Sequence, residues 1–590
     1  MSARPDDLIR ELIHESIAAL SQQGLVALDV VPEIRIDRTR DPAHGDHACN
    51  IALVLAKRVG MSPRDLAQQL IDNLPAADDL KKAEIAGPGF INFFLRDGLA
   101  HTVISQILEH KDQFGRNDKG AGIKVQIEFV SANPTGPLHV GHGRGAAYGA
   151  SLANLLQANG YTVQREYYVN DAGRQMDILA VSVWLRYLEL AGEKLPFPVN
   201  GYQGDYVWDI GASLHREQGD AMRHPAAEVL TGLPDDESDG GDKEQYIDAL
   251  IARCKSLLTK QQYAQVHAQG LLEITDNIRR DLKEFAVEYE EWFKESSLMQ
   301  SGAVPRAIER LQSAGHVYEK NGALWFRSSA FGDEKDRVLR RDNGLYTYFA
   351  SDIAYHMNKL ERGFDRLINI WGSDHHGYVP RVRAAIEALG GKPQQLEVLL
   401  VQFAKLYRDG KQLSMSTRSG QFVTLRELRE ETGNDAARFF YVMRKCEQHL
   451  DFDLDLAKSQ SNDNPVYYIQ YAHARVCSVF RQLHDKALQW DENAGLENLA
   501  LLNEPHETDL IRVLGRYADL IEKAGNSHEP HQITYYLRDV AQAFHTYYNA
   551  HTFIVDDSAM RNARLCLIAA TRQLIHNGLA ILGVSAPETM

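Results

Sequence analysis

The stretch Ser131-Ala-Asn-Pro-Thr-Gly-Pro-Leu-His-Val-Gly-His-Gly-Arg144 predicts the fold of the central part of this chain. Before it, residues 123–130 alternate in polarity and are rich in β-branched side chains, which is typical of a strand. After it, residues 145–156 carry small residues and leucines at helical spacing. The stretch is therefore a strand-to-helix crossing. In an open α/β sheet, ligands bind at such crossings, beside the positive N-terminus of the helix.

Two histidines, His139 and His142, give this crossing its chemistry. Imidazoles beside a helix N-terminus can donate hydrogen bonds to phosphate oxygens as charge develops on them. Gly141 stands between them and lacks a Cβ, so a flat ring such as adenine could lie against the backbone. The pattern resembles the His-x-Gly-His signature of class I aminoacyl-tRNA synthetases and related nucleotidylyl transferases, which implies an ATP site on these three residues. The alternative is a pair of histidines that only flank a turn.

Length and composition indicate a globular protein of several domains. A chain of 590 residues is too long for one hydrophobic core, and three or four domains are expected. Hydrophobic residues make up 44% and charged residues 24%, which is ordinary for a soluble protein. The acidic, amphipathic start lacks the basic region of a secretory or mitochondrial signal, and no apolar run is expected to span a membrane. We therefore expect a cytoplasmic protein.

Cysteine and histidine spacing predicts no metal site. The five cysteines are scattered and form no Cys-x-x-Cys pair, so neither a disulfide framework nor structural zinc is indicated. The groups His44, Asp46, His47 and His375-His376 lack the cysteine partners or helical spacing of metal ligands. The net charge of −16 argues against a general nucleic-acid binder, although a local basic face would suffice for phosphate contacts.

Four parts of different pattern follow one another along the chain. Residues 1–110 combine strand and helix patterns, and the polar, glycine-containing run 111–122 is typical of a linker. From residue 123, strands alternate with helices, which predicts an α/β fold with a Rossmann-like, doubly wound parallel sheet. The predicted parts are an N-terminal α+β domain (1–110), a catalytic domain (123–405) with a helical insertion (about 186–320), a signature loop with connecting helices (406–464) and an all-α C-terminal domain (465–590).

Individual elements are predicted from local periodicity and capping signals. Strands are expected at 34–37, 84–95 (as a hairpin), 162–169, 323–326, 346–350, 366–371 and 397–403. Helices are expected at 50–57, 63–74 with Ser62 as N-cap, 353–361, 379–389, 466–490, 508–525, 532–551 and 558–582, and long helices are expected to fill 243–316. The acidic run 234–242 is expected to be a mobile surface loop.

Class I synthetases carry a second ATP-holding element after the sheet, the Lys-Met-Ser-Lys-Ser loop. Here the sequence reads Gly410-Lys-Gln-Leu-Ser-Met-Ser-Thr-Arg-Ser-Gly420: the Met-Ser core is present, but serine and threonine replace both signature lysines. Lys411 and Arg418 are the nearby cations that could neutralise phosphate charge. A basic surface turn is the alternative. The loop predicts Lys411, Ser416 and Arg418 as catalytic residues and Met415 and Ser416 as ATP contacts.

Two further turns follow predicted strands. In Trp371-Gly-Ser-Asp-His-His-Gly-Tyr378, Gly372 would let a nucleotide approach and Asp374 can accept hydrogen bonds from ribose hydroxyls, as at the Gly-x-Asp-Gln turn of class I enzymes. Tyr348 and Asp352 are four residues apart, and an aromatic face with a carboxylate suits a planar guanidinium. For this second pair, a core tyrosine and an aspartate at a helix start are the alternative.

The four motifs, in this order on one chain, resemble those of bacterial arginyl-tRNA synthetases. The resemblance covers nearly the whole length, including Gly-Pro-Gly-Phe-Ile-Asn at 87–92, Asp-Ala-Ala-Arg at 435–438 and the helical tail. It implies that arginine is held by Glu128, Ser131, Asn133, His142, Tyr348 and Asp352. His375, which replaces the glutamine of some relatives, is expected to line the same pocket.

The resemblance also implies the reaction and the partners. Arginine would attack the α-phosphorus of ATP, bound with Mg²⁺ as a substrate complex, to give arginyl-adenylate and pyrophosphate, and the terminal adenosine of tRNA(Arg) would then accept the arginyl group. The family implies a monomer, tRNA-dependent activation, an N-terminal domain at the tRNA elbow and a C-terminal domain at the anticodon loop. Tyrosines available there for base stacking are Tyr467, Tyr468, Tyr471, Tyr547 and Tyr548, and helix packing is the alternative for most of them.

Three other interpretations stay open at this point. Another class I synthetase would share the ATP motifs, although a cysteine enzyme would need a zinc site that the cysteine spacing does not predict. A simpler nucleotidylyl transferase would explain the histidine motif but would leave the N-terminal domain and the helical tail without a role. A non-catalytic tRNA-binding relative would explain the missing loop lysines. Arginine-dependent ATP–pyrophosphate exchange separates these interpretations.

Overall fold

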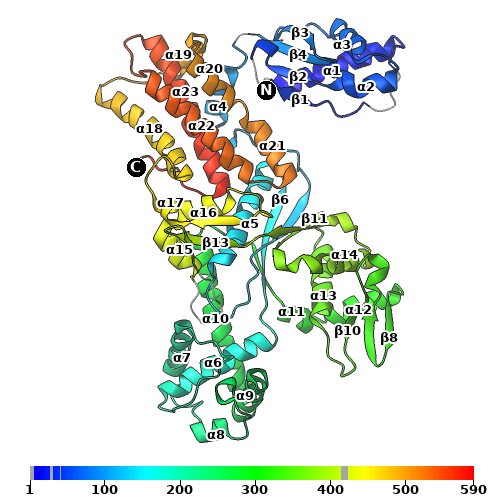
Figure 1. The fold of residues 1–590 in the computed structure, drawn as a ribbon, viewed down its shortest axis with the longest axis vertical. Coiled ribbons are helices and arrows are strands. Elements are labelled where there is room, and N and C mark those ends of the chain that lie inside the picture. Colours follow the sequence, from blue (N-terminus) through cyan, green and yellow to red (C-terminus); the bar gives the residue numbers. More distant parts are fainter. Residues whose placement is uncertain (1–4, 27–30, 40–41, 97, 414–422) are drawn as a thin grey trace. The chain divides into compact units, whose positions relative to one another are not determined.

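The structure, a computed structural model, describes all residues except 1–4, 27–30, 40–41, 97 and 414–422 (Figure 1). The chain folds into two compact units. The first unit consists of Met1–Lys111, Leu483–Gly515 and Tyr547–Ala570, and the second unit of Asp112–Gln482, Arg516–Thr546 and Thr571–Met590. The Met415, Ser416 and Arg418 predictions concern positions outside the described residues.

The N-terminal part of the first unit is a four-stranded antiparallel sheet with helices packed against it. Ser62 caps α3 as predicted, because its hydroxyl accepts the backbone N–H of Asp65 at 3.2 Å. The sheet order is β1-β2-β4-β3, with β1 Ile36–Arg38, β2 His47–Cys49, β3 Leu80–Ala86 and β4 Phe90–Leu95, and the helices are α1 Pro5–Gln22, α2 Ile51–Val59 and α3 Pro63–Asp72. The predicted α+β character of this part is confirmed.

A five-stranded parallel sheet forms the centre of the second unit. Its order is β12-β11-β5-β6-β7, so the chain runs outward from β5 to one edge through β6 and β7, and to the other edge through β11 and β12. Ligands bind at such a change of direction, beyond the carboxyl ends of the strands. The strands are β5 Lys124–Glu128, β6 Thr162–Val169, β7 Glu291–Lys294, β11 Arg366–Gly372 and β12 Leu396–Val401, and the connecting helices include α5 Val140–Ala158 and α14 Val379–Ala388.

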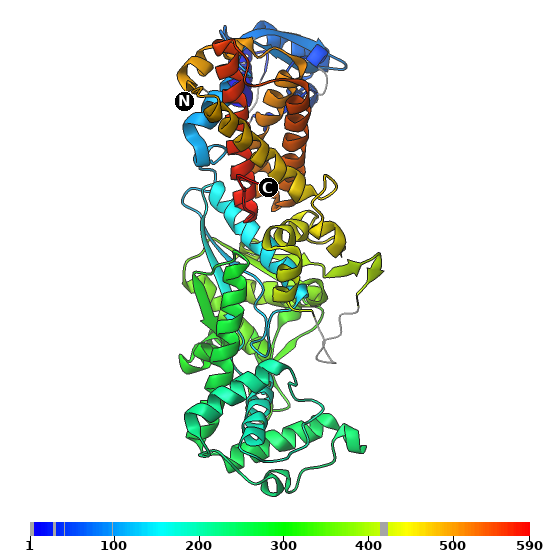
Figure 2. The same cartoon turned by 90° about the vertical axis from the view of Figure 1, so that its left-hand side faces the viewer.

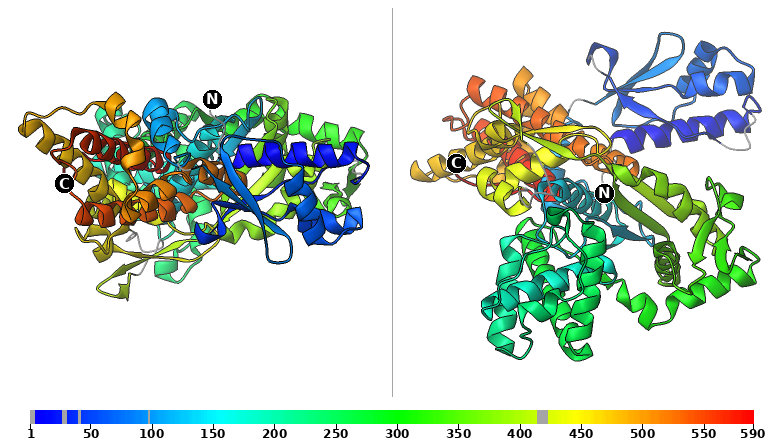
Figure 3. Two further views of the ribbon diagram at one scale, coloured as in Figure 1. Left: turned by 90° about the horizontal axis from the view of Figure 1, so that it is seen from above. Right: turned by 60° about the horizontal axis from the view of Figure 1, so that its bottom comes forward.

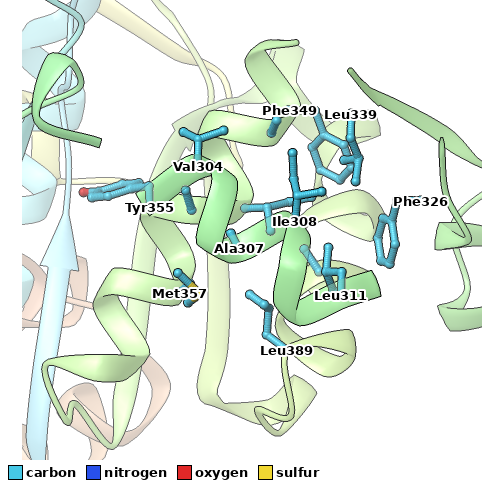
Figure 4. Close-up of a cluster of buried hydrophobic side chains, with 14 of the residues drawn as sticks. Val304, Ala307, Ile308, Leu311, Phe326, Leu339, Phe349, Tyr355, Met357 and Leu389 are labelled. Carbon is cyan, nitrogen blue, oxygen red and sulfur yellow. The ribbon is translucent and has the colours of Figure 1, made fainter. Parts of the chain in front are cut away.

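Two strands expected in this sheet lie outside it, and one of them is not a strand. Residues 323–326 form β9, but in a separate antiparallel sheet of order β10-β9-β8, where β8 is Val317–Lys320 and β10 is Arg337–Arg340. Residues 346–350 are not a strand, because α13 begins at Tyr348 and runs to Glu361. Short aromatic runs fit both strands and buried helix starts. In both cases the apolar side chains pack into one cluster between α12 (Ala303–Ser313), α13 and the small sheet (Figure 4).

The helical insertion follows β6 and returns to the sheet at β7 (Figures 2 and 3). The expectation that helices fill 243–316 missed the short strand β7. The acidic run is structured: it holds a 3₁₀ turn at Glu237–Asp239, and Asp236 is buried and accepts the backbone N–H of Val199 at 2.9 Å. The helices are α6 Arg174–Leu190, α7 Asp205–Gln218, α8 Ala226–Leu230, α9 Lys243–Leu257, α10 Lys260–Glu284 and α11 Ser296–Gln300.

A third sheet of the second unit, not expected from the sequence, lies around the signature loop. β13 (Ala404–Arg408) pairs in parallel with β15 (Leu450–Asp453) and in antiparallel fashion with the two-residue β14 (Lys411–Gln412). Three helices complete this region: α15 Leu425–Thr432, α16 Asn434–Val442 and α17 Leu454–Lys458.

The chain ends in helices, as predicted. One expected helix, 508–525, is two, because the chain breaks between α20 (Pro505–Leu514) and α21 (Tyr517–Ser527). By length and composition alone, α23 (Ser558–Leu582) is long and apolar enough to cross a membrane, a kind of segment that the sequence was not expected to contain. However, 78% of its most apolar 18-residue segment is buried inside the protein, as in the core helix of a globular domain. The remaining helices are α4 Thr102–His110, α18 Pro465–Asp485, α19 Glu492–Glu497 and α22 His531–Ala550.

Candidate active site

The two motif histidines form the start of α5. His139 is the N-cap residue, and its Nδ1 accepts the backbone N–H of Gly141 at 3.0 Å. His142 reaches back, and its Nδ1 accepts the backbone N–H of His139 at 3.3 Å. The two rings stack with their centroids 3.7 Å apart. The histidines thus satisfy the first donors of the helix, as a capping box does.

Burial determines the charge of the two rings, and these hydrogen bonds determine which ring nitrogen carries the proton. Burial lowers the pKa of His139, and burial together with the charge of His139 lowers the pKa of His142 to about 3. Both imidazoles are therefore neutral at physiological pH. Because each Nδ1 accepts a backbone N–H, the ring proton resides on Nε2, which makes Nε2–H the donor that each ring can offer to a ligand.

An aromatic ring that the sequence analysis missed, Phe403, lies between the two glycines of the predicted ATP site. A Cβ placed on Gly141 would stand 3.4 Å from this ring, and one placed on Gly372 would stand 3.5 Å from it. The Phe403 side chain is 47% exposed. An exposed aromatic face between two backbone-only surfaces can stack on a flat ring. One feature of the sequence could have indicated Phe403: it is an aromatic residue at the end of a strand pattern.

The turn after β11 brings Asp374 and His375 together. Their side chains are each 61% exposed, and His375 Nε2 lies 3.6 Å from Asp374 Oδ2. A Cβ on Gly372 would stand 2.5 Å from Asp374 Oδ1, so the carboxylate folds back over this glycine. The glycine at 372 therefore makes room for Asp374 beside Phe403. That His375 lines the arginine pocket stays a prediction.

Tyr348 and Asp352 lie one turn apart on α13, as their spacing predicted. The Tyr348 ring is 64% exposed, and its hydroxyl lies 3.3 Å from where a Cβ on Gly173 would stand, so the ring reaches from α13 toward the start of α6. The Tyr378 hydroxyl donates to Asp352 Oδ2. Burial, and then the charge of Glu128, raise the pKa of Asp352 to about 6.

A second carboxylate near Asp352 escaped the sequence analysis. Glu295 follows β7 and is only 9% exposed. Burial, and then the charges of Asp352 and Asp171, raise its pKa to about 7. The Asn170 amide donates to Glu295 Oε2 at 2.6 Å and contacts the amide of Asn133 at 3.1 Å. In the described part of the chain, neither Asp352 nor Glu295 forms an ion pair, so both carboxylates are available to a cation.

Three more residues that were predicted to bind arginine lie at the end of β5 and in the turn after it: Glu128, Ser131 and Asn133. The backbone there is left-handed at two residues that are not glycine, Val130 (φ 69°) and Ser131 (φ 42°), an arrangement that persists only where neighbours enforce it. Ser131 Oγ donates to Glu128 Oε1 at 3.1 Å and accepts the backbone N–H of Tyr168 at 3.1 Å. Glu128 Oε2 pairs with Lys359 Nζ at 2.6 Å, so its charge is balanced within the protein.

The described residues that follow the signature loop in the chain are bonded to the histidine turn. The backbone N–H of Val140 donates to the carbonyl of Val423 at 3.1 Å, and that of Leu425 donates to the carbonyl of Leu138 at 2.8 Å. Residues 423–425 therefore lie directly beside the histidine turn. Lys411 is exposed on β14.

The tyrosines named for anticodon stacking differ in exposure. Tyr547 is wholly buried and donates to Glu507 Oε1 at 3.0 Å, which makes it a packing residue. Tyr467 and Tyr471 are half-buried and stack on each other at 5.9 Å, and the Arg475 guanidinium lies 4.4 Å from the centre of the Tyr471 ring. Two rings and a guanidinium thus lie in a row along α18, and aromatic rings and arginine side chains are groups on which unpaired bases can stack.

The chain matches the sequence models of three domain families. "Arginyl tRNA synthetase N terminal domain" matches residues 7–95, "tRNA synthetases class I (R), catalytic domain" matches 103–450, and "DALR anticodon binding domain" matches 469–590. All three lie on the chain in the order that the motifs imply.

Full-length relatives agree with these matches. The chain is 63% identical over 584 residues to an arginine–tRNA ligase of Thioalkalivibrio sulfidiphilus, covering 99% of this chain and 100% of the relative. It is 57% identical over 583 residues to one from Legionella pneumophila, covering 99% of this chain and 100% of that relative. Its fold resembles the arginyl-tRNA synthetase of Thermus thermophilus, with a TM-score of 0.73 at 23% identity, covering 98% of this chain and 100% of that structure.

Proposed function

Since this chain belongs to the arginyl-tRNA synthetase family, we propose that its second unit binds arginine and ATP side by side at the carboxyl ends of β5, β6 and β11. The enzyme is an arginine–tRNA ligase of class I. It joins L-arginine to its cognate tRNA in an ATP-dependent reaction that passes through arginyl-adenylate and releases AMP and pyrophosphate.

The proposed arginine pocket rests on one observation, the two carboxylates Asp352 and Glu295. Each has a raised pKa because burial and like charges oppose its ionisation, so a bound cation would stabilise the ionised form of both. Arginine carries two cationic groups, the guanidinium and the α-ammonium, which is one for each of the two carboxylates. Tyr348, one turn from Asp352 and largely exposed, would place its ring against the guanidinium plane.

The amino-acid end of arginine would lie at the turn after β5. We assign Asn133 and Ser131 to its polar groups, and His142 to the boundary with ATP, where its Nε2–H can donate to a carboxylate or phosphate oxygen. Glu128 would act on this end of the pocket through the Ser131 hydroxyl, which it holds at 3.1 Å. We assign His375, which lies beside Asp374, to the edge of the arginine pocket.

ATP, as the substrate complex with Mg²⁺, would lie across the histidine turn. Adenine would stack on Phe403 and lie against Gly141, and the ribose would approach Gly372 and Asp374. His139 and His142 would donate to the phosphates with help from the N-terminus of α5. The arginine carboxylate then attacks the α-phosphorus, pyrophosphate leaves, and the protein contributes positioning and hydrogen bonds.

The signature loop would supply the positive charge for the leaving pyrophosphate. We propose Lys411 and Arg418 as its cations and Met415 and Ser416 as ATP contacts. The hydrogen bonds that residues 423 and 425 form with residues 138 and 140 support this, because they place the described residues after the loop beside His139. A cation in this place offsets charge that develops in the transition state.

The remaining proposals concern tRNA and the cellular setting. We assign residues 1–110 to the tRNA elbow and 465–590 to the anticodon loop of tRNA(Arg), with Tyr467, Tyr471 and Arg475 as a stacking surface. The tRNA-dependence of activation, a monomeric enzyme and a cytoplasmic location complete the proposal.

The pocket is tested by a pair of variants at neighbouring carboxylates. Glu295→Gln should raise the arginine KM about tenfold or more in aminoacylation, because one cation loses its partner, and should leave the ATP KM within about twofold. Asp171→Asn is the matched control. Asp171 is also buried, but both of its oxygens accept hydrogen bonds from Ser296 at 2.7 and 2.8 Å, so its role is structural. Equal effects of the two variants on the arginine KM would refute the pocket. ATP–pyrophosphate exchange with and without tRNA tests the tRNA-dependence.

A further inference from the structure

A row of polar side chains crosses the buried face of the parallel sheet beneath α13. The strand register pairs Glu128 of β5 with Asn369 of β11 on one side and with Glu166 of β6 on the other. Side chains in register on parallel strands point to the same face. Glu128 is 7% exposed, and Asn369 and Glu166 are fully buried. Buried carboxylates cost several kcal/mol unless they are paired, so this row needs partners.

Helix α13 supplies a cation for each glutamate. Lys359 Nζ lies 2.6 Å from Glu128 Oε2 and 2.9 Å from Asn369 Oδ1. One turn further along the helix, the Arg362 guanidinium lies 2.5 and 3.0 Å from the two oxygens of Glu166. Each ion pair thus joins a glutamate of the sheet to a cationic side chain of α13.

Of the two ion pairs, only Lys359–Glu128 is linked by hydrogen bonds to residues of the proposed arginine pocket. On one side, the second oxygen of Glu128 accepts the Ser131 hydroxyl at 3.1 Å, and Ser131 belongs to the left-handed turn at the amino-acid end of the pocket. That turn needs an enforcing neighbour, and Glu128 provides it. The partners of Glu166 are Arg362 and the Tyr355 hydroxyl at 2.5 Å, and Tyr355 is a core residue.

On the other side, hydrogen bonds connect Lys359 to the backbone of Asp352. Asn369 Nδ2 lies 3.1 Å from His356 Nε2, and His356 Nδ1 lies 2.8 Å from the carbonyl oxygen of Asp352. Burial, and then the charge of Lys359, lower the pKa of His356 to about 3, so the ring is neutral. Its Nδ1–H then donates to Asp352 and its Nε2 accepts from Asn369.

We propose that Lys359 is a positioning residue of the arginine site, which holds Glu128 and the Ser131 turn on one side and the Asp352 backbone on the other. Lys359 is fully buried and so acts through these partners and not on substrate. It also balances the charge of Glu128, which leaves Asp352 and Glu295 as the carboxylates that meet arginine. This inference rests on the arginine pocket proposed above.

The test compares two double variants in the full-length enzyme. Lys359→Met/Glu128→Gln removes the pair that leads to the pocket, and Arg362→Met/Glu166→Gln removes the control pair. Removing both charges together avoids an unpaired buried charge, so both proteins are expected to fold. Circular dichroism and thermal melting check this, and aminoacylation with arginine or ATP varied gives the KM values.

The first double variant should raise the arginine KM about tenfold, which corresponds to about 1.4 kcal/mol of lost positioning, and should leave the ATP KM within about twofold. The control pair should move neither KM beyond about twofold. Equal shifts of the arginine KM in both double variants would overturn the inference, because Lys359 would then be one more structural ion pair. So would an unchanged arginine KM in the first.

Two further variants keep the result interpretable. If the first double variant does not fold, Glu128→Gln replaces it, with Glu166→Gln as control, and the same comparison of KM values decides. Asp352→Asn in the same assay reports on the pocket itself. If Asp352→Asn raises the arginine KM and the Lys359 variant does not, only the inference about Lys359 fails. If neither does, the proposed pocket fails with it.

Discussion

Asparagine at position 352 would remove a negative charge from the arginine pocket and keep the shape of the side chain. The Tyr378 hydroxyl, which donates to Asp352 Oδ2, can donate equally to an amide oxygen. The carbonyl of residue 352 would still accept from His356 Nδ1. Helix α13 is therefore expected to keep its place, and Asp352→Asn tests the charge alone.

The expected magnitude follows from burial and from the second carboxylate. Removing one partner of a buried ion pair costs about 3–5 kcal/mol. Asp352 is half-buried, and Glu295 remains to balance one of the two cations of arginine, so the lower end applies. A loss of about 3 kcal/mol corresponds to roughly a hundredfold rise in the arginine KM. The ATP KM should change less than about twofold, because Asp352 has no proposed contact with the nucleotide.

Steady-state aminoacylation measures both constants, with arginine varied at saturating ATP and tRNA and then ATP varied at saturating arginine. Asp333→Asn is the control, because Asp333 is a carboxylate of the second unit that is buried and pairs with Arg337 at 2.7 Å. The control should lower the melting temperature and leave both KM values unchanged. Proportional rises of the arginine and ATP KM in Asp352→Asn, or a lower melting temperature with unchanged KM, would refute a charge role for Asp352.

Three further predictions follow from the site. The arginine KM should rise as pH falls from 8 to about 5.5. Glu295 (pKa about 7) and then Asp352 (pKa about 6) gain protons in this range and lose the charge that binds arginine. Aminoacylation measured over a series of pH values tests this, and an arginine KM that does not change with pH would contradict it. Phe403→Ala should raise the ATP KM about tenfold, since a stacking face is worth about 1 kcal/mol or somewhat more, and equal change in the arginine KM would place the ring elsewhere. Lys411→Gln should lower kcat about tenfold or more with little change in KM, measured in steady-state aminoacylation; an unchanged kcat would contradict a catalytic role for Lys411 and leave the role to Arg418.

The central fold was predictable because its signals are local. The alternation of 123–130, the glycines and prolines of the turn and the small-residue helix after it each lie within about a dozen residues, and the structure has β5 and α5 there. Capping signals such as Ser62 are equally local. The expectation of a strand at 346–350 is wrong, and the strand at 323–326 lies in another sheet than expected. Periodicity over four or five residues neither separates a strand from a helix start nor shows which strands are its neighbours.

The sequence predicts candidate site residues where they belong to a motif, and it misses residues that meet from distant elements. Lys359 looks like a surface lysine of an amphipathic helix, yet its partner Glu128 is 231 residues away and both are buried. Glu295 follows a four-residue strand between helices, and nothing in its neighbourhood distinguishes it from other acidic residues. Only strand register and burial reveal that these groups need each other, and neither can be read from a sequence pattern.

The two histidines of the opening stretch narrow the question of where the catalytic charge comes from. With pKa values lowered by burial, His139 and His142 are neutral, so they offer Nε2–H dipoles and no positive charge to the phosphates. The N-terminus of α5 adds a partial charge of about half an elementary charge. As pyrophosphate leaves, more negative charge collects on it than these dipoles can balance. Under the proposed function, Mg²⁺ bound to ATP and a cation of the signature loop would balance the rest. Because both loop lysines are replaced, the proposed function leaves Lys411 or Arg418 to supply that charge, and the kcat of Lys411→Gln would show which of the two does so.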